Sequence, residues 1–336
     1  MCAEQRRQPG CGSSFDSVMS EGAPAAGVVD LLRGASVCAV IVTYNIGEPI
    51  HQCFNSIRHQ VGHVILVDNA SDEPTRRELD KLASQDSVTV ILNERNEGIP
   101  HAFNQGVKWA LDKGCRWVLT LDDDSKASPD MVERLLQAAE VSRQLGQDDV
   151  GIIGANAFDE NSRSYLNGYR PGDRGGKPIE MEHVISSGSM IAGRVFERVG
   201  LFDEALFAYY IDDDFCWRLR KAGFRIFLCP DAVLLHREGA KEARRWLGRR
   251  VFYDRLGNSA RYYLTRNALY IMRKHPLGFA YCRDIIRRLV RDTVKVLLYD
   301  PERFSRLRFT LNGLADALRG RFGPMPSRRA YDRWGS

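Results

Sequence analysis

The chain has 336 residues, of which 44% are hydrophobic and 27% charged. These are the proportions of a globular protein, and the length suits one large domain with an appendage or two modest domains. No apolar run approaches the roughly 18 residues that span a bilayer, and the N-terminus lacks an apolar signal core. The formal net charge is only +5, and no nucleic-acid partner is expected.

The eight cysteines are scattered along the chain. They form no Cys-x-x-Cys pair and no Cys/His cluster that would indicate zinc. Several lie in apolar runs, where a free cysteine behaves as a small hydrophobic residue. This usage predicts a reducing, cytoplasmic location.

Three regions differ in composition. Residues 1–34 are rich in Gly, Ser, Ala and Pro with little periodicity, which predicts a disordered N-terminal segment. Residues 35–275 carry alternating strand and helix patterns and are predicted to form one domain. Residues 276–336 read as a basic amphipathic helical tail.

Apolar runs that suit buried strands alternate with helical patterns in the first half of the chain. The predicted strands are 37–42, 64–67, 88–92 and 117–121. Helices are predicted from about Glu48, Thr75, Pro100 and Ser128. The alternation predicts an α/β domain with a mostly parallel, doubly wound sheet.

Three adjacent carboxylates, Asp122, Asp123 and Asp124, follow the strand 117–121 directly. Adjacent anions repel one another, so a fold is expected to keep them together only where a cation compensates their charge. A hard divalent ion such as Mg²⁺ or Mn²⁺ suits oxygen ligands and commonly bridges carboxylates to phosphates. The alternative is a solvated acidic turn before the next helix.

The other predicted strands also end in polar residues. Thr43, Tyr44 and Asn45 follow the first strand, and Asp68 and Asn69 follow the second. The carboxyl ends of the strands in an open α/β sheet meet along one edge, so we expect a ligand crevice there. Asp68 alone could equally cap a turn.

A second acidic triplet, Asp212, Asp213 and Asp214, opens a helix that is predicted to end at Gly223. Acidic residues in a first helical turn interact favourably with the helix dipole, but that does not explain three in a row. His236 closes a short apolar strand, a position where a lone histidine is more often structural than a ligand.

The tail beyond Pro276 has 13 Lys/Arg against 6 Asp/Glu, a local charge of +7 that leaves −2 on the remainder. A helix is predicted around residues 285–298 and a second from about Phe304 to Leu318. Basic amphipathic helices of this kind can lie in an anionic membrane interface. The alternative is that they pack on the domain and leave a solvated basic face.

The combined motifs resemble the inverting family 2 glycosyltransferases of GT-A fold. The motifs fall in that family's order over residues 37–275. They are residues 42–45, 67–71, 96–98, 104–106, 122–124 and 200–204, followed by 212–218 and His236. Within the family the chain is similar to bacterial L-rhamnosyltransferases of the rhamnolipid or polysaccharide-precursor type, through residues 185–188, 206–207 and 261–267.

The resemblance implies roles for particular residues. Asp122 and Asp124 would form the DxD motif and bind the metal ion with His236. Asp212 would be the catalytic base, with Asp213 and Asp214 as rivals, although the family usually has Glu where this chain has Ile211. The residues implied in donor binding are Thr43, Tyr44, Asn45, Asp68, Asn69, Arg95, Asn96, Gly98, Asp122 and Asp123.

The activity expected from the resemblance is an inverting transfer that depends on Mg²⁺ or Mn²⁺. The donor would be a nucleotide sugar, most simply dTDP-L-rhamnose, and the acceptor a lipid-linked or glycolipid molecule at the inner face of the plasma membrane, which the tail would contact. Alternatives are a galactofuranose or hexose nucleotide donor, or a nucleotide-sugar-binding module without catalysis. A dinucleotide dehydrogenase is disfavoured because the first strand does not end in a Gly-rich turn.

Overall fold

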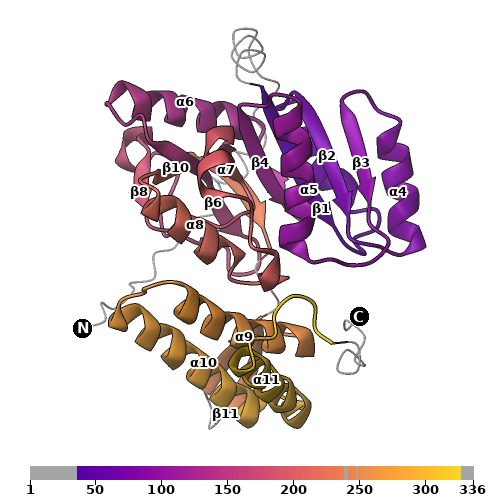
Figure 1. The fold of residues 1–336 in the computed structure, drawn as a ribbon, viewed down its shortest axis with the longest axis vertical. Coiled ribbons are helices and arrows are strands. Elements are labelled where there is room, and N and C mark those ends of the chain that lie inside the picture. The colour runs from indigo at the N-terminus through magenta and orange to yellow at the C-terminus, as the bar shows by residue number, and fades with distance from the viewer. Residues whose placement is uncertain (1–35, 238–240, 247–248, 255, 327–336) are drawn as a thin grey trace.

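The computed structural model describes residues 36–237, 241–246, 249–254 and 256–326 (Figure 1). The segment 1–34, predicted to be disordered, lies outside the described residues. The described chain forms a mixed α/β body with a layer of helices beneath it, as the ribbon in Figure 1 shows. The predicted α/β architecture is therefore confirmed.

Among the described residues, ten strands form the central sheet. Its main order is β3-β2-β1-β4-β9-β6-β10-β5. These strands are β1 Val37–Thr43, β2 His63–Asp68, β3 Val88–Leu92, β4 Trp117–Asp122, β5 Lys126–Ala127, β6 Val150–Asp159, β9 Ser189–Ala192 and β10 Arg225–His236. Two short strands, β7 Ser164–Tyr165 and β8 Ile179–Met181, pair with β6 and β10 at the margin.

Strands β3, β2, β1 and β4 are parallel, as the alternation of strands and helices predicts. The second half of the sheet departs from this pattern because β9 runs antiparallel to both β4 and β6. The short strand predicted to end at His236 is part of a longer strand, β10, which has a register shift between Cys229 and Val233. Strand β10 runs parallel to β6, so its carboxyl end reaches the same edge as that of β4.

Helices cover both faces of the sheet, which explains why its strands are continuous apolar runs. Successive residues of β1 alternate between the two cores: Ala39 and Ile41 pack with α3, α4 and α6, whereas Val40 and Val42 pack with α5, α7 and α8. The helices are α3 Ile50–Ile57, α4 Glu73–Ala83, α5 Ile99–Asp112, α6 Met131–Gln144, α7 Gly193–Val199 and α8 Ile211–Lys221. Two short 3₁₀ helices, η1 Asp173–Gly176 and η2 Glu204–Leu206, lie in the connections.

The C-terminal layer consists of α9 Asn258–Lys274, α10 Phe279–Tyr299 and α11 Arg303–Leu318, next to a hairpin of β11 Lys241–Trp246 and β12 Arg249–Asp254 (Figure 1). Helix α11 crosses α9 so closely that a Cβ on Gly313 would lie 2.4 Å from the carbonyl oxygen of Tyr262. The two predicted tail helices are both present. In the described part of the chain, no helix is long and apolar enough to cross a membrane.

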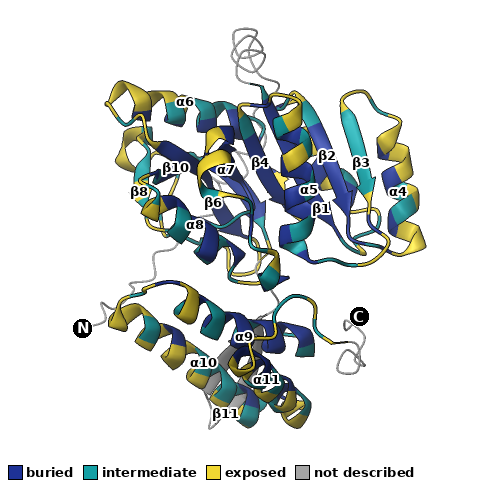
Figure 2. Ribbon diagram, viewed as in Figure 1, coloured by how far each residue is buried: buried dark blue, intermediate teal, exposed yellow. Residues whose placement is uncertain are grey.

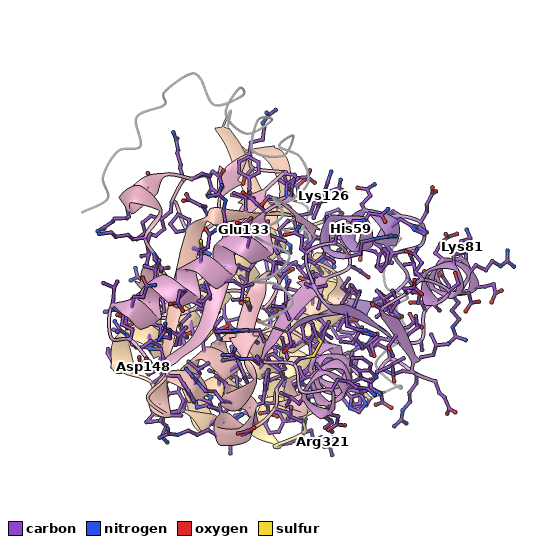
Figure 3. All side chains as sticks on the ribbon, turned by 90° about the horizontal axis from the view of Figure 1, so that it is seen from above. His59, Lys81, Lys126, Glu133, Asp148 and Arg321 are labelled. Atoms are coloured by element: carbon purple, nitrogen blue, oxygen red, sulfur yellow. A yellow bond between two sulfur atoms is a disulfide. The ribbon has the colours of Figure 1, made fainter. Side chains whose placement is uncertain are left out.

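The cysteines differ from the expectation of free thiols. Cys38 on β1 and Cys115, just before β4, form a disulfide, drawn as a yellow bond in Figure 3. Their Cα atoms lie 6.2 Å apart because β1 pairs with β4. Cys53, Cys216, Cys229 and Cys282 are free. The two cysteines lie 77 residues apart and are brought together by neighbouring strands, so no local cysteine spacing in the sequence indicates this disulfide.

Candidate active site

A cavity of about 450 Å³ opens at the carboxyl ends of β1, β4 and β10. Its position confirms the crevice expected where the strands end in polar residues. Many of the predicted donor and metal residues line it: Thr43, Tyr44, Asn69, Asn96, Gly98, Asp122, Asp123, Asp124 and His236. They come from five separate stretches of the chain, which the sheet brings together.

Asp122, Asp124 and His236 form a group that fits a divalent metal ion. Each offers one ligand atom, and these atoms all lie within 4.8 Å of one another. Asp122 ends β4, and His236 ends β10. Two carboxylates and one imidazole suit Mn²⁺ or Mg²⁺, with coordination positions left for phosphate oxygens and water.

Two serines orient this group, and sequence reasoning missed both. The Ser125 hydroxyl is hydrogen bonded to Nδ1 of His236 at 3.2 Å and to the hydroxyl of Ser187 at 2.8 Å. Ser187 in turn accepts a hydrogen bond from the backbone N–H of Asp122 at 3.0 Å. With Nδ1 engaged in this way, Nε2 of His236 is the nitrogen left to ligate a metal ion.

Two carboxylates of the first triplet, Asp122 and Asp123, are costly to ionise without a cation. The pKa of Asp122 is raised to about 6, mainly by burial and also by the nearby charges of Asp124 and Asp212, while the His236 charge lowers it. Burial also raises the pKa of Asp123 to about 7, although the carboxylate accepts a hydrogen bond from the Tyr44 N–H at 3.0 Å. A divalent cation would supply the missing compensation.

On the donor side, Asp68 lies fully buried beneath the cavity and is not one of its lining residues. Its two carboxylate oxygens accept hydrogen bonds from the Thr43 hydroxyl at 3.1 Å and from the Ser71 N–H at 3.0 Å. In this structure Asp68 therefore fixes the ends of β1 and β2 relative to each other.

Asn69, Asn96 and Gly98 form one wall of the cavity. The Asn69 side chain donates to the carbonyl of Gly98 at 3.1 Å, and the Asn96 side chain accepts from the Gly98 N–H at 2.9 Å. Gly98 has φ 92° and ψ 162°, a conformation that is essentially restricted to glycine.

Besides Asp68, two further predicted donor residues do not line the cavity. Asn45 binds the neighbouring turn: its N–H donates to the Ser71 hydroxyl at 2.8 Å and its side chain accepts from the Asp72 N–H at 2.7 Å. Arg95 is exposed and pairs with Glu97. Their assignment to donor binding stays a prediction.

The three carboxylates of the second triplet differ in environment. Burial raises the pKa of Asp212, an effect that the His183 charge and hydrogen bonds from Ser186 partly offset. Asp212 also raises the pKa of Asp122, which places it within electrostatic reach of the metal-binding group. Asp213 accepts a hydrogen bond from the Tyr281 hydroxyl of α10 at 2.9 Å.

Asp214 is fully buried and surrounded by basic side chains. Its carboxylate lies 2.8 Å from Arg218 Nε, 2.6 Å from Lys274 Nζ and 2.8 Å from His275 Nε2. A carboxylate with three such partners has a structural role in joining α8 to the end of α9. The assignment of Asp212 as the base, with Asp213 as its rival, stays a prediction.

The remaining wall of the cavity comes from Phe207, Ala208 and Tyr209, just before α8. No role for this wall is predicted from local sequence beyond the likeness of residues 206–207 to the rhamnosyltransferases. Its backbone explains why a pattern search misses it, since Phe207, Tyr209 and Tyr210 all have positive φ, which sequence periodicity does not encode.

Comparison with known families matches residues 38–200 to the family described as "Glycosyl transferase family 2". Among characterised proteins, the chain is 28% identical over 299 residues to the dTDP-rhamnosyl transferase RfbF of Shigella flexneri, which covers 85% of this chain and 96% of RfbF. It is 26% identical over 227 residues to the low-salt glycan biosynthesis hexosyltransferase Agl10 of Haloferax volcanii, covering 64% and 71% of the two chains.

Solved structures share the fold at lower sequence identity. GalNAc-T7, crystallised with UDP, GalNAc and Mn²⁺, superposes with a TM-score of 0.52 at 18% identity, over 63% of this chain and 44% of that one. A 1–349 fragment of S. aureus TarS superposes with a TM-score of 0.51 at 16% identity, over 88% and 82% of the two chains. These similarities support the fold alone.

Proposed function

We propose that this chain, whose residues 38–200 match the family 2 glycosyltransferases, moves L-rhamnose from dTDP-L-rhamnose to a lipid-linked or glycolipid acceptor with inversion at the anomeric carbon. The observation that carries the proposal is the position of Asp212, a carboxylate with raised pKa that lies within electrostatic reach of the group Asp122, Asp124 and His236. The rhamnosyl donor is supported by the similarity to RfbF over nearly its whole length.

In the proposed reaction, Asp212 accepts the proton of an acceptor hydroxyl. The hydroxyl oxygen forms a bond to the anomeric carbon from the face opposite the diphosphate. The bond between that carbon and the diphosphate oxygen breaks, and dTDP leaves with the electron pair. One direct displacement inverts the anomeric centre, so no protein nucleophile is needed.

Asp122, Asp124 and His236 would hold Mg²⁺ or Mn²⁺, which supplies charge neutralisation for the leaving diphosphate. The protein contributes the rest of the site. Ser125 and Ser187 fix the His236 imidazole, and Tyr44 holds Asp123 through its backbone N–H. The cavity between β1 and the segment before α8 would take the nucleoside and the sugar.

A hexose nucleotide, or galactofuranose nucleotide, is the alternative donor, and the similarity to the hexosyltransferase Agl10 favours keeping it open. A binding module without catalysis is the second alternative. The placement of Asp212 argues against this second alternative, because binding a nucleotide sugar does not require a base.

We also propose that α10 contacts an anionic membrane surface at the inner face of the plasma membrane, where a lipid-borne acceptor is found. Only part of the apolar face predicted for this helix is buried: Ile285 and Val296 pack inward. Ile286, Val290, Val294 and Leu298 recur every four residues and are 47–56% exposed (exposed positions along α10 are yellow in Figure 2).

A basic row lies beside this exposed apolar stripe, one residue further along the chain at each turn. It consists of Arg283, Arg287, Arg291 and Lys295. An apolar stripe flanked by cations matches the acyl boundary and headgroups of an anionic membrane. The hydrogen bond between Tyr281 and Asp213 joins the start of this helix to the acidic triplet.

The experiment that tests the transferase is a donor screen. The protein is incubated with Mg²⁺ or Mn²⁺ and a panel of sugar nucleotides, with and without bacterial lipid extract, and nucleoside diphosphate release is measured. Release from dTDP-rhamnose that a chelator abolishes supports the donor and the metal. Release only from a hexose or galactofuranose nucleotide overturns the rhamnose assignment, and binding without release from any donor favours the binding module.

A further inference from the structure

Residues 205–210, which form one wall of the cavity, have a strained backbone. Phe207 has φ 63° and ψ −50°, and the Ala208 N–H donates to the Leu206 carbonyl at 2.7 Å. This is a γ-turn of the form with positive φ, which is rare and strained. Tyr209 and Tyr210 follow with φ 62° each. Such conformations persist in bulky residues only where the surroundings impose them.

Two neighbouring side chains of α9 contact the carbonyl groups of this segment. The Asn267 amide donates to the carbonyls of Leu206, Ala208 and Tyr209 at 2.9, 2.5 and 3.0 Å. The Arg266 guanidinium donates to the carbonyls of Ala205 and Leu206 at 3.0 and 2.8 Å. The acceptor of the γ-turn, the Leu206 carbonyl, therefore also binds both side chains.

The two side chains are themselves fixed. Arg266 and Asn267 are both 0% exposed, and Arg266 Nε donates to the Asn267 amide oxygen at 2.9 Å, which turns the amide nitrogen toward the segment. The guanidinium carbon lies 4.8 Å from the ring centre of Tyr263 and 5.5 Å from that of Tyr262. Burying a charged guanidinium costs free energy. Because Arg266 is buried and donates its hydrogen bonds to backbone carbonyls, we infer that the positions of these carbonyls matter.

The held segment contacts the opposite wall of the cavity. The Phe207 carbonyl accepts from the Ile99 N–H at 2.8 Å, and the Phe207 ring stacks on Tyr263 with centroids 4.9 Å apart. Two residues after Tyr210, the chain reaches Asp212 in the first turn of α8. The conformation of residues 205–210 thus sets both the width of the cavity and the start of the helix that carries the acidic triplet.

We propose that Arg266 and Asn267 are positioning residues, which hold residues 205–210 in their strained conformation and so shape the donor cavity and place Asp212. This inference rests on the proposed function of the cavity as the nucleotide-sugar site. It assigns a role to two residues of the stretch 261–267. Neither Arg266 nor Asn267 lines the cavity, so both act through residues 205–210.

The test uses Arg266→Lys, which keeps the charge but loses the planar set of donors, and Asn267→Leu, which removes the amide. Hydrogen exchange of the amides in residues 205–212 is measured by mass spectrometry in the full chain, without ligand. We expect exchange there to accelerate at least tenfold in both variants. Binding of dTDP and UDP with Mn²⁺ is measured by calorimetry, and the Kd of whichever nucleotide binds the wild type should rise at least tenfold.

The matched control is Tyr262→Phe, which keeps the ring near Arg266 but removes the hydroxyl that donates to Asp316 at 2.8 Å. It loosens the contact between α9 and α11, so its melting temperature should fall while exchange in 205–212 and the nucleotide Kd stay within twofold of wild type. Equal acceleration in Tyr262→Phe, or none in either test variant, overturns the inference. If the wild type binds neither nucleotide, the proposed function fails, and the exchange data alone decide this inference. Should Asn267→Leu not fold, Arg266→Lys carries the same comparison.

Discussion

Gly98 and Phe207 lie in direct backbone contact across the cavity. A Cβ on Gly98 would be 2.6 Å from the Phe207 carbonyl oxygen, closer than any stable contact. The adjoining Ile99 N–H donates to the same oxygen at 2.8 Å. The two walls of the proposed donor site therefore meet only because residue 98 has no side chain.

The first prediction concerns this contact. In Gly98→Ala, the methyl group must push Phe207 away, and the backbone must adopt a conformation that costs a residue with a side chain about 1–3 kcal/mol. We expect nucleotide affinity to fall at least tenfold, measured by calorimetry. The control is Gly114→Ala. Gly114 also has a positive φ, but the space around its Cβ position is open. We expect this variant to be less stable than the wild type but to bind the nucleotide with unchanged affinity.

The second prediction concerns Asp212 as the base. Asp212→Asn should lower kcat by about 10²- to 10⁴-fold, because a positioned base contributes that much to such reactions. The Kd of the nucleotide should change little. For the wild type, the rate should rise with pH through the raised pKa of Asp212, since only the ionised carboxylate accepts a proton. Turnover that survives Asp212→Asn would shift the role to Asp213.

The third prediction separates Asp214 from that role. Removing one member of a buried charge cluster leaves the others uncompensated, so Asp214→Asn should lower the free energy of unfolding by about 3 kcal/mol. Lys274 and His275 would be left beside a neutral amide. Urea unfolding of Asp214→Asn and Asp212→Asn, compared side by side, checks this; equal stability of the two variants contradicts the structural role of Asp214.

The fourth prediction is a dependence of stability on pH in the presence of a chelator. Asp123 has a pKa of about 7 when folded, above the value of about 3.9 in an unfolded chain. The Asp123 carboxyl therefore binds its proton more tightly in the folded state than in the unfolded chain. This difference adds to the free energy of unfolding below about pH 4, and the contribution is lost as the pH rises through 7.

In Asp123→Asn, the side-chain amide does not ionise, so this position no longer lowers the stability as the pH rises. The amide oxygen still accepts the hydrogen bond from the Tyr44 N–H. At pH 8 without metal, the variant should be more stable than the wild type by about 4 kcal/mol, and the difference should shrink toward pH 4. Thermal unfolding across this pH range measures it. Addition of Mn²⁺ at pH 8 should raise the melting temperature of the wild type, and a pH-independent difference would contradict the assignment.

The fifth prediction concerns the exposed stripe of α10. Val290→Asp places a charge in the middle of that stripe, and sedimentation with phosphatidylglycerol vesicles should fall at least tenfold. Leu145→Asp, at an exposed apolar position at the end of α6, is the matched control and should bind as the wild type does. If Val290→Asp leaves vesicle binding unchanged but dissociates a dimer in light scattering, the stripe binds a second copy and not a membrane.

Much of the architecture follows from local sequence. The four parallel strands, the helices between them and both tail helices are confirmed at the predicted places, because apolar runs and helical periodicity are local signals. Helix α4 begins earlier than predicted because Asp72, and not Thr75, caps it; the Asp72 carboxylate accepts from the Thr75 N–H and hydroxyl.

The features that sequence did not predict all depend on contacts between distant segments. The serines that orient His236, the disulfide between Cys38 and Cys115 and the antiparallel insertion of β9 join segments with no shared local pattern. Asp212, Asp213 and Asp214 could not be ranked from sequence, since the partners of Asp214 include Lys274 and His275, some sixty residues on.

The separation of Ser125 and His236 by 111 residues has a consequence for biosynthesis. As the chain leaves the ribosome, β1 to β4 emerge first and can pair with one another through local connections. Asp122 and Asp124 are then present, but β10 has yet to be translated. Because contacts between distant segments form late in folding, the cation pocket is completed only after most of the protein has been made. A nascent chain that stalls before β10 would therefore display an acidic strand end without the histidine that completes it.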